Sequence, residues 1–170
     1  SLTDIIDGTS FAAVSGLNIC ILRSSYRHFG YKKRLHIWLT PGDYRNANLM
    51  IILAYIITGH PDWQGAEIDL FAATRQSKKE SEVQRLNELV AAGRIPISSS
   101  NIRHVPMGDQ HTFEQLVSKH SAEADLVMTG FSLRKMQNDQ GAFLRGFGDI
   151  KDMLFVRAGQ RILIAEDSEE

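Results

Sequence analysis

Short apolar runs rich in β-branched residues alternate along the chain with longer segments in which apolar residues recur at helical spacing. The apolar runs, each bounded by turn residues, lie at residues 17–22, 35–39, 67–73, 102–105 and 125–129. Helical spacing is found at residues 46–59, 77–93 and 112–120, and the last of these opens with a capping-box pattern from Thr112 to Gln115. This alternation predicts an α/β fold with a mainly parallel central sheet and helices on both faces.

The C-terminal part of the chain adds one helix and two strands to this prediction. Helical spacing recurs at four apolar residues, Phe143, Leu144, Phe147 and Ile150. Two further apolar runs, residues 153–157 and 161–165, flank a short segment with a central glycine, Gly159. We therefore expect these two runs to pair as a C-terminal antiparallel hairpin.

Length and composition fit a single globular domain. The chain has 170 residues, of which 43% are hydrophobic, and it begins with Ser1, which favours an excised or processed fragment. We expect residues 1–16 to be a linker or a short helix, residues 17–165 to form one α/β domain, and residues 166–170 to be an acidic tail. The longest apolar run, residues 49–57, is shorter than the roughly 20 residues that a membrane-spanning helix needs.

The charge of the chain bears on its partners, and its cysteine content bears on disulfide bonds. The 19 basic and 20 acidic residues give a net charge of -1, so there is no general attraction to nucleic acid. Basic and aromatic residues gather at residues 27–34, which indicates either a solvated loop or a surface that touches anionic lipid or a transmembrane domain. Cys20 is the single cysteine, which excludes an internal disulfide, and we interpret it as a small core residue of a strand.

The helical segment at residues 46–59 contains no charged side chain. A helix that packs on one side of a sheet normally presents a polar stripe to water, so this segment needs a cover on its second face. That cover is either a neighbouring part of the same chain or the surface of a partner. The second alternative predicts a homodimer contact through Leu49, Ile52 and Ile56.

Six segments carry a family resemblance through their order and spacing. They are LHIWL at residues 35–39, LAYII at 53–57, Trp63, IDLF at 68–71, ADLVMT at 124–129 and MLFVRAGQ at 153–160. Together they resemble the C-terminal cytosolic domain of cation–chloride cotransporters, Na-K-Cl cotransporter-like, in a compact prokaryotic form. The turn after the tryptophan strand, residues 40–45, is longer than the family's, and a related amino-acid permease with a similar cytosolic domain stays open as an alternative.

The resemblance implies an α/β domain similar to universal stress proteins, attached after a transmembrane bundle. It implies a non-catalytic regulatory role on the cytoplasmic side of the cell membrane. The partners that it implies are a second copy of the chain and the transmembrane domain of the same transporter. It carries no catalytic residue and no cofactor over to this chain, because the ion-binding residues of the family lie in membrane helices.

A crevice at the carboxyl ends of the strands is the place where a ligand would bind, because doubly wound sheets hold ligands where the strand order reverses. The residues expected there are Thr40, Gly42, Asp43, Thr129, Gly130 and Ser132. They would serve a nucleotide-sensing domain of the universal stress type, although the glycines lack the spacing of that family's phosphate loop. A small α/β enzyme with Asp43 as general base is the second alternative. Six scattered histidines lack metal-ligand spacing, so no metal site is predicted.

Overall fold

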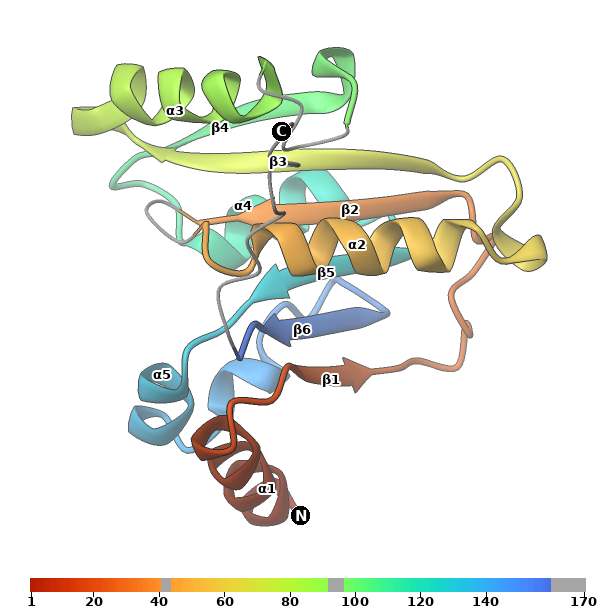
Figure 1. Cartoon of the computed structure of the whole chain (residues 1–170), viewed down its shortest axis with the longest axis vertical. Coiled ribbons are helices and arrows are strands. Elements are labelled where there is room, and N and C mark those ends of the chain that lie inside the picture. Colours follow the sequence, from red (N-terminus) through yellow and green to blue (C-terminus); the bar gives the residue numbers. More distant parts are fainter. Residues whose placement is uncertain (41–43, 92–96, 160–170) are drawn as a thin grey trace, which may run out of the picture.

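A computed structural model describes residues 1–40, 44–91 and 97–159 of the chain. Its centre is a six-stranded sheet with the strand order β1-β6-β5-β2-β3-β4 (Figure 1). The strands are β1 (Ile19–Arg23), β2 (Arg34–Leu39), β3 (Glu67–Arg75), β4 (Ile102–Met107), β5 (Leu126–Gly130) and β6 (Met153–Arg157). All neighbouring pairs are parallel except β1 with β6, so the predicted α/β class with a mainly parallel sheet is confirmed.

The antiparallel partner of β6 is the edge strand β1, with Ile19 opposite Arg157 and Arg23 opposite Met153. The second strand of the hairpin expected from the sequence, residues 161–165, lies outside the described residues. The backbone N–H of Ala158 donates to Asn46 Oδ1 at 2.8 Å, and that of Gly159 donates to the Oδ1 of Asn18 at 2.9 Å. The chain just after β6 is therefore bound to two other parts of the fold.

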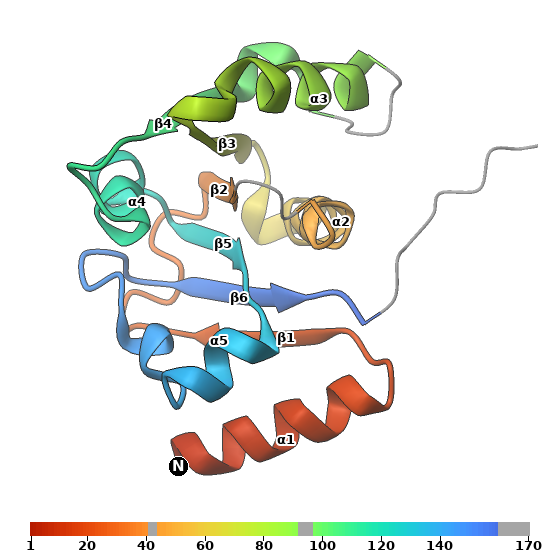
Figure 2. The ribbon, with the colours of Figure 1, turned by 90° about the vertical axis from the view of Figure 1, so that its left-hand side faces the viewer.

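Helices cover both faces of the sheet, as predicted. The helices are α1 (Leu2–Val14), α2 (Ala47–Thr58), α3 (Lys79–Ala91), α4 (Phe113–Ser121) and α5 (Leu133–Asn138). One core cluster joins α2 and α3 to the first face, and a second cluster joins α1, α4 and α5 to the opposite face. Figure 2 shows the sheet nearly edge-on, with α2 and α4 on its two sides.

Helix starts follow local capping chemistry. Thr112 Oγ1 accepts from the N–H of Gln115 at 3.2 Å, and Gln115 Oε1 accepts from the N–H of Thr112 at 2.9 Å, which confirms the predicted capping box of α4. At the N-terminus, Ser1 and Asp4 form the same kind of reciprocal cap. Residues 2–14 are thus a helix, the second of the two alternatives that the sequence left open.

The predicted helix over residues 143–150 is wrong, and the reason lies in Arg23. Its guanidinium donates to the carbonyl oxygens of Leu144, Phe147 and Ile150 at 3.0, 3.1 and 2.8 Å, and also to that of Gly146. In a continuous α-helix these carbonyls would all point along the helix axis toward N–H groups four residues later, so they could not converge on one guanidinium. The segment instead forms the short 3-10 helix η4 (Ala142–Arg145) and a loop, while the four apolar side chains stay buried.

The segment between β1 and β2 crosses the ends of two intervening strands. Because β6 and β5 lie between β1 and β2 in the sheet, residues 24–33 must pass the amino ends of both. The residue before each of these strands is a buried aspartate: Asp152 precedes β6 and is 1% exposed, and Asp125 precedes β5 and is 4% exposed. Each carboxylate binds the backbone of the crossing segment.

Three hydrogen bonds reach each carboxylate. Asp152 accepts from the N–H of Ser25 at 2.6 Å, from its hydroxyl at 3.0 Å, and from the N–H of Phe29 at 3.2 Å. Asp125 accepts from three backbone N–H groups, those of Tyr31, Lys33 and Arg34, at 3.1, 2.8 and 3.0 Å. The basic loop is therefore fixed at its backbone by two buried acids rather than being only a solvated turn.

Gly30 sits at the tightest point of this crossing. Its φ is +52°, and a Cβ added there would lie 2.6 Å from Asp125 Oδ1. A side chain at this position would therefore push directly into the carboxylate that holds the loop, and an L-residue is also strained at this φ.

We expect Asp125→Asn to lower the free energy of unfolding by about 2–3 kcal/mol, because an amide places a donor against at least one of three backbone N–H groups. Urea denaturation at pH 7 measures this, and Asp109→Asn, at an exposed aspartate, should stay close to the wild type. An Asp125→Asn chain as stable as Asp109→Asn would show that the carboxylate does not hold the crossing segment.

Candidate functional site

The strand order reverses between β2 and β5, and a small cavity lies at the carboxyl ends of these two strands. Four of the six residues predicted for the crevice line it: Thr40, Thr129, Gly130 and Ser132. The other two, Gly42 and Asp43, lie outside the described residues. The cavity volume is about 160 Å³. The structure therefore brings together the described members of the predicted set, at the place where the topology required them.

Aromatic rings form the walls of this crevice, a feature that the sequence analysis missed. The rings come from Phe113, Phe131, Phe143 and Phe147. Phe131 and Phe143 stack with ring centroids 5.8 Å apart, and Phe113 meets Phe147 edge-on at 6.0 Å. The helical spacing of Phe113, Phe143 and Phe147 in the sequence indicated only burial, because the loop that turns Phe143 and Phe147 toward the crevice is held by Arg23.

The polar groups of the crevice are already engaged. The hydroxyl of Ser132 accepts from the N–H of Lys135 at 3.1 Å and caps α5. Lys135 Nζ is 3.7 Å from Glu114 Oε1 and 5.8 Å from the centroid of the Phe143 ring. At about 160 Å³, the cavity is smaller than the roughly 300–1,000 Å³ of typical small-molecule sites. By itself the crevice would hold a small apolar group and not a whole nucleotide.

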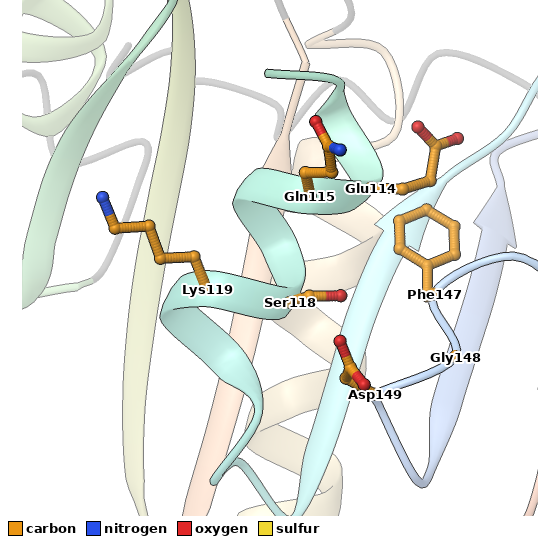
Figure 3. A pocket seen from close by; sticks show the side chains of 7 residues that line it. All are labelled: Glu114, Gln115, Ser118, Lys119, Phe147, Gly148 and Asp149. Carbon is orange, nitrogen blue, oxygen red and sulfur yellow. The ribbon is translucent and has the colours of Figure 1, made fainter. Parts of the chain in front are cut away.

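A second hollow, of about 400 Å³, lies between α4 and residues 147–149 (Figure 3). Glu114 and Ser118 of α4 line it opposite Asp149, while Lys119 extends away from the two carboxylates. Phe147 belongs to the walls of both this hollow and the crevice. The charged side chains here are exposed or half-buried, so they stay in contact with water. An acid–base pair in an enclosed active site would be shielded from water instead.

Ser121, His36 and Asp69 lie in the order of a hydrolytic triad. His36 Nδ1 is 2.8 Å from Ser121 Oγ, and His36 Nε2 is 3.8 Å from Asp69 Oδ2. However, the indole N–H of Trp38 donates to the same Ser121 oxygen at 2.8 Å. Ser121 is 0% exposed, so a substrate could not reach it without the core opening.

The pKa of His36 also argues against a general base here. The pKa of His36 is lowered to about 4, mainly by burial and also by the nearby positive charges of Arg34 and Arg103. A group with this pKa is a weak proton acceptor at neutral pH. The hydrogen bonds among His36, Trp38 and Ser121 instead attach the last turn of α4 to the central strand β2.

The three residues predicted for an interface do not all lie on the outer face of α2. Leu49 is 7% exposed and packs in the first core cluster, so it does not lie on a free surface. Ile52 and Ile56 are 39% and 66% exposed, and Tyr55 lies with them on the exposed side. The correction for Leu49 follows from helical geometry, because α2 turns this side chain toward the strands β2, β5 and β6 that it covers.

The edge strand β1 presents a second apolar surface on the same side of the sheet. Cys20 is exposed, which corrects the expectation that it is a core residue, and Leu22 is 51% exposed. Their partners across the strand pair, Val156 and Leu154, belong to the cluster that α2 covers. β1 lies beyond the strands β2, β5 and β6 that α2 mainly contacts, so no described helix on this side of the sheet packs closely over these two residues.

Lowering the pH should destabilise the chain through His36. Its pKa is about 4 when folded and about 6.5 in an unfolded chain, so the unfolded state binds the proton first and stability falls as pH drops from 6.5 toward 4. Between pH 7 and pH 5 we expect this to cost about 2 kcal/mol. His36→Gln should remove that part of the pH dependence in urea denaturation, whereas His111→Gln should keep it. If stability fell equally with pH in the wild type, His36→Gln and His111→Gln, the pH dependence would not come from His36.

The proteins that resemble this chain were found by comparing structures, because the comparisons of sequence found none. No protein-family model matches the chain, and no curated protein is similar to it in sequence. Among the described residues, no helix is long and apolar enough to cross a membrane.

Several solved structures resemble the chain in fold. The cytoplasmic domain of a prokaryotic cation chloride cotransporter matches 92% of this chain with a TM-score of 0.62 at 12% identity. A protein from Pseudomonas aeruginosa UCBPP-PA14 described as a universal stress protein matches 88% with a TM-score of 0.55 at 14% identity. A universal stress protein from Archaeoglobus fulgidus DSM 4304 matches 94% with a TM-score of 0.51 at 11% identity.

The chain spans 58%, 55% and 66% of these three neighbours, so each of them is longer. At such low identity the likeness concerns the fold, and not the function. The chain has the α/β fold that universal stress proteins share with the cytoplasmic domain of a prokaryotic cation chloride cotransporter.

Proposed function

We propose that the chain is a non-catalytic regulatory domain of a cation–chloride cotransporter-like membrane transporter. In this proposal it lies on the cytoplasmic side of the membrane, pairs with a second copy of itself and contacts the transmembrane domain of the same transporter. The observation that carries the proposal is the uncharged helix α2, whose outer face exposes Ile52, Tyr55 and Ile56 to solvent.

An exposed helix face without charge is unusual for a chain that works alone. Charged side chains make up 23% of the sequence, yet residues 46–59 contain none. The helix still needs its inner face for the core, where Met50, Ile51 and Ala54 are almost fully buried. The outer residues have no such role within the described chain, so their apolar character supports a partner surface.

The open face of β1 extends the apolar surface available on this side of the sheet. Cys20 and Leu22 are exposed there, next to strands that α2 does cover. A second copy related by a two-fold axis would bury the same helix face on both chains, which is how most homodimers are built. The fold likeness to a cotransporter's cytoplasmic domain agrees with this role and does not establish it.

A ligand-sensing domain of the universal stress type is the second candidate. The observation in its favour is the crevice between β2 and β5, which four of the predicted residues line. An enzyme is less favoured, because the Ser121–His36–Asp69 arrangement is buried and its histidine has a low pKa.

Pairing through α2 predicts a dimer of about twice the 19.1 kDa chain mass in light scattering across a concentration series. Ile56→Glu should shift the chain to a monomer that keeps the circular dichroism spectrum of the folded chain, because the side chain is 66% exposed and a buried charge opposes association. Leu49→Glu should instead unfold the chain, since Leu49 is part of the core.

Phe11→Glu is the matched control for this experiment. Phe11 is 75% exposed on α1, so the substitution adds the same charge at another apolar surface position and should leave the dimer intact. A wild-type chain that stays monomeric at high concentration, or a dimer that Ile56→Glu leaves unchanged, would contradict pairing through α2.

A further inference from the structure

Three arginines line one pocket beside the crevice. The pocket has a volume of about 300 Å³, and the guanidinium-bearing residues are Arg45, Arg134 and Arg157. Its other lining residues are Asn46, Phe131, Ser132 and Leu133. Among the described residues that line it, none is acidic. We call this set the arginine pocket; it concentrates positive charge in a chain whose net charge is only -1.

The arginines come from the carboxyl ends of three adjacent strands. Arg157 is the last residue of β6, Arg134 follows β5 in the first turn of α5, and Arg45 lies between β2 and α2. In open parallel sheets this edge is where ligands bind. Sequence reasoning missed the set because its members are 89 and 23 positions apart, and only the parallel strand order brings them together.

Arg157 is held in an unusual state for an arginine. Its Nη1 is buried and has no hydrogen-bond partner in the described part of the chain. Burial lowers the pKa of Arg157, and the nearby positive charge of Arg45 lowers it further. A buried guanidinium nitrogen without a partner is costly unless a ligand supplies an acceptor.

The two other arginines are also available to a ligand. Arg45 and Arg134 are exposed, and within the described ranges no ion pair involves any of the three. Within the described residues, the side chain of Arg45 has a single long hydrogen bond, from its Nη2 to the carbonyl oxygen of Gly159 at 3.4 Å. A group with several negative oxygens would satisfy guanidinium donors on all three residues at once.

We propose that the arginine pocket binds the phosphate group of a small molecule, held between Arg45, Arg134 and Arg157. A phosphate carries up to two negative charges and offers several acceptor oxygens, which suits three guanidinium groups better than a single halide ion does. This site does not depend on pairing through α2 or on a role in transport.

The neighbouring crevice extends the site in one direction. Phe131 and Ser132 line both cavities, so the arginine pocket and the aromatic crevice adjoin each other. A phosphate ester bound at the arginines would direct its organic part toward the rings of the crevice. Inorganic phosphate would use the arginines alone, so the two sources of phosphate differ in what the crevice adds.

Isothermal titration calorimetry of the full chain with inorganic phosphate, AMP and ATP, at constant ionic strength and chloride, tests the proposal. We expect binding that weakens at least about tenfold in Arg134→Gln and in Arg45→Gln, as loss of a charge-assisted hydrogen bond should cause. Tighter binding of AMP or ATP than of phosphate would identify an organic phosphate, whereas equal binding would identify the free anion.

Arg145→Gln is the matched control, because Arg145 is an exposed arginine outside the arginine pocket. It should bind phosphate compounds like the wild type, and the melting temperatures of all unliganded variants should agree because the substituted arginines are exposed. Absence of binding by all three compounds at millimolar concentration overturns the proposal. So does binding that survives Arg45→Gln and Arg134→Gln together, since the phosphate would then lie elsewhere.

Discussion

Two buried carboxylates hold the fold together where its topology is most demanding. The edge strand β1 and the central strand β2 are consecutive in sequence but separated by β6 and β5 in the sheet. The segment between them satisfies its backbone N–H groups on Asp152 and Asp125, each placed one residue before the strand that it passes. Without these acceptors, partly buried N–H groups of the crossing would lack partners, which costs free energy of folding.

The position of the candidate sites depends on that crossing. Because β1 is brought to the edge beside β6, Arg23 at its end reaches the carbonyl groups of residues 144–150. Those contacts shape the loop that presents Phe143 and Phe147 to the crevice. The aromatic walls thus follow from a strand pairing, and the arginine pocket follows from the parallel order of β2, β5 and β6.

The fold alone is compatible with more than one role. Universal stress proteins and the cytoplasmic domain of a cation chloride cotransporter share it with this chain at 11–14% identity. What distinguishes the roles is local: an uncharged helix face favours a protein partner, and clustered arginines favour an anion. Both features can coexist, because they lie on different residues and one does not require the other.

The sequence by itself determined the α/β class, most strand positions and the capped start of α4, because these depend on periodicity and on residues close together in the chain. It also located the crevice at residues 40 and 129–132, since parallel strands place their carboxyl ends at one edge. The tertiary structure alone decided that Cys20 is exposed, that Leu49 is buried and that residues 143–150 are not an α-helix. It alone brought Arg45, Arg134 and Arg157 together. Each of these outcomes depends on contacts between residues far apart in the chain, such as Arg23 with the carbonyl groups of the 144–150 loop, and no local pattern encodes such contacts.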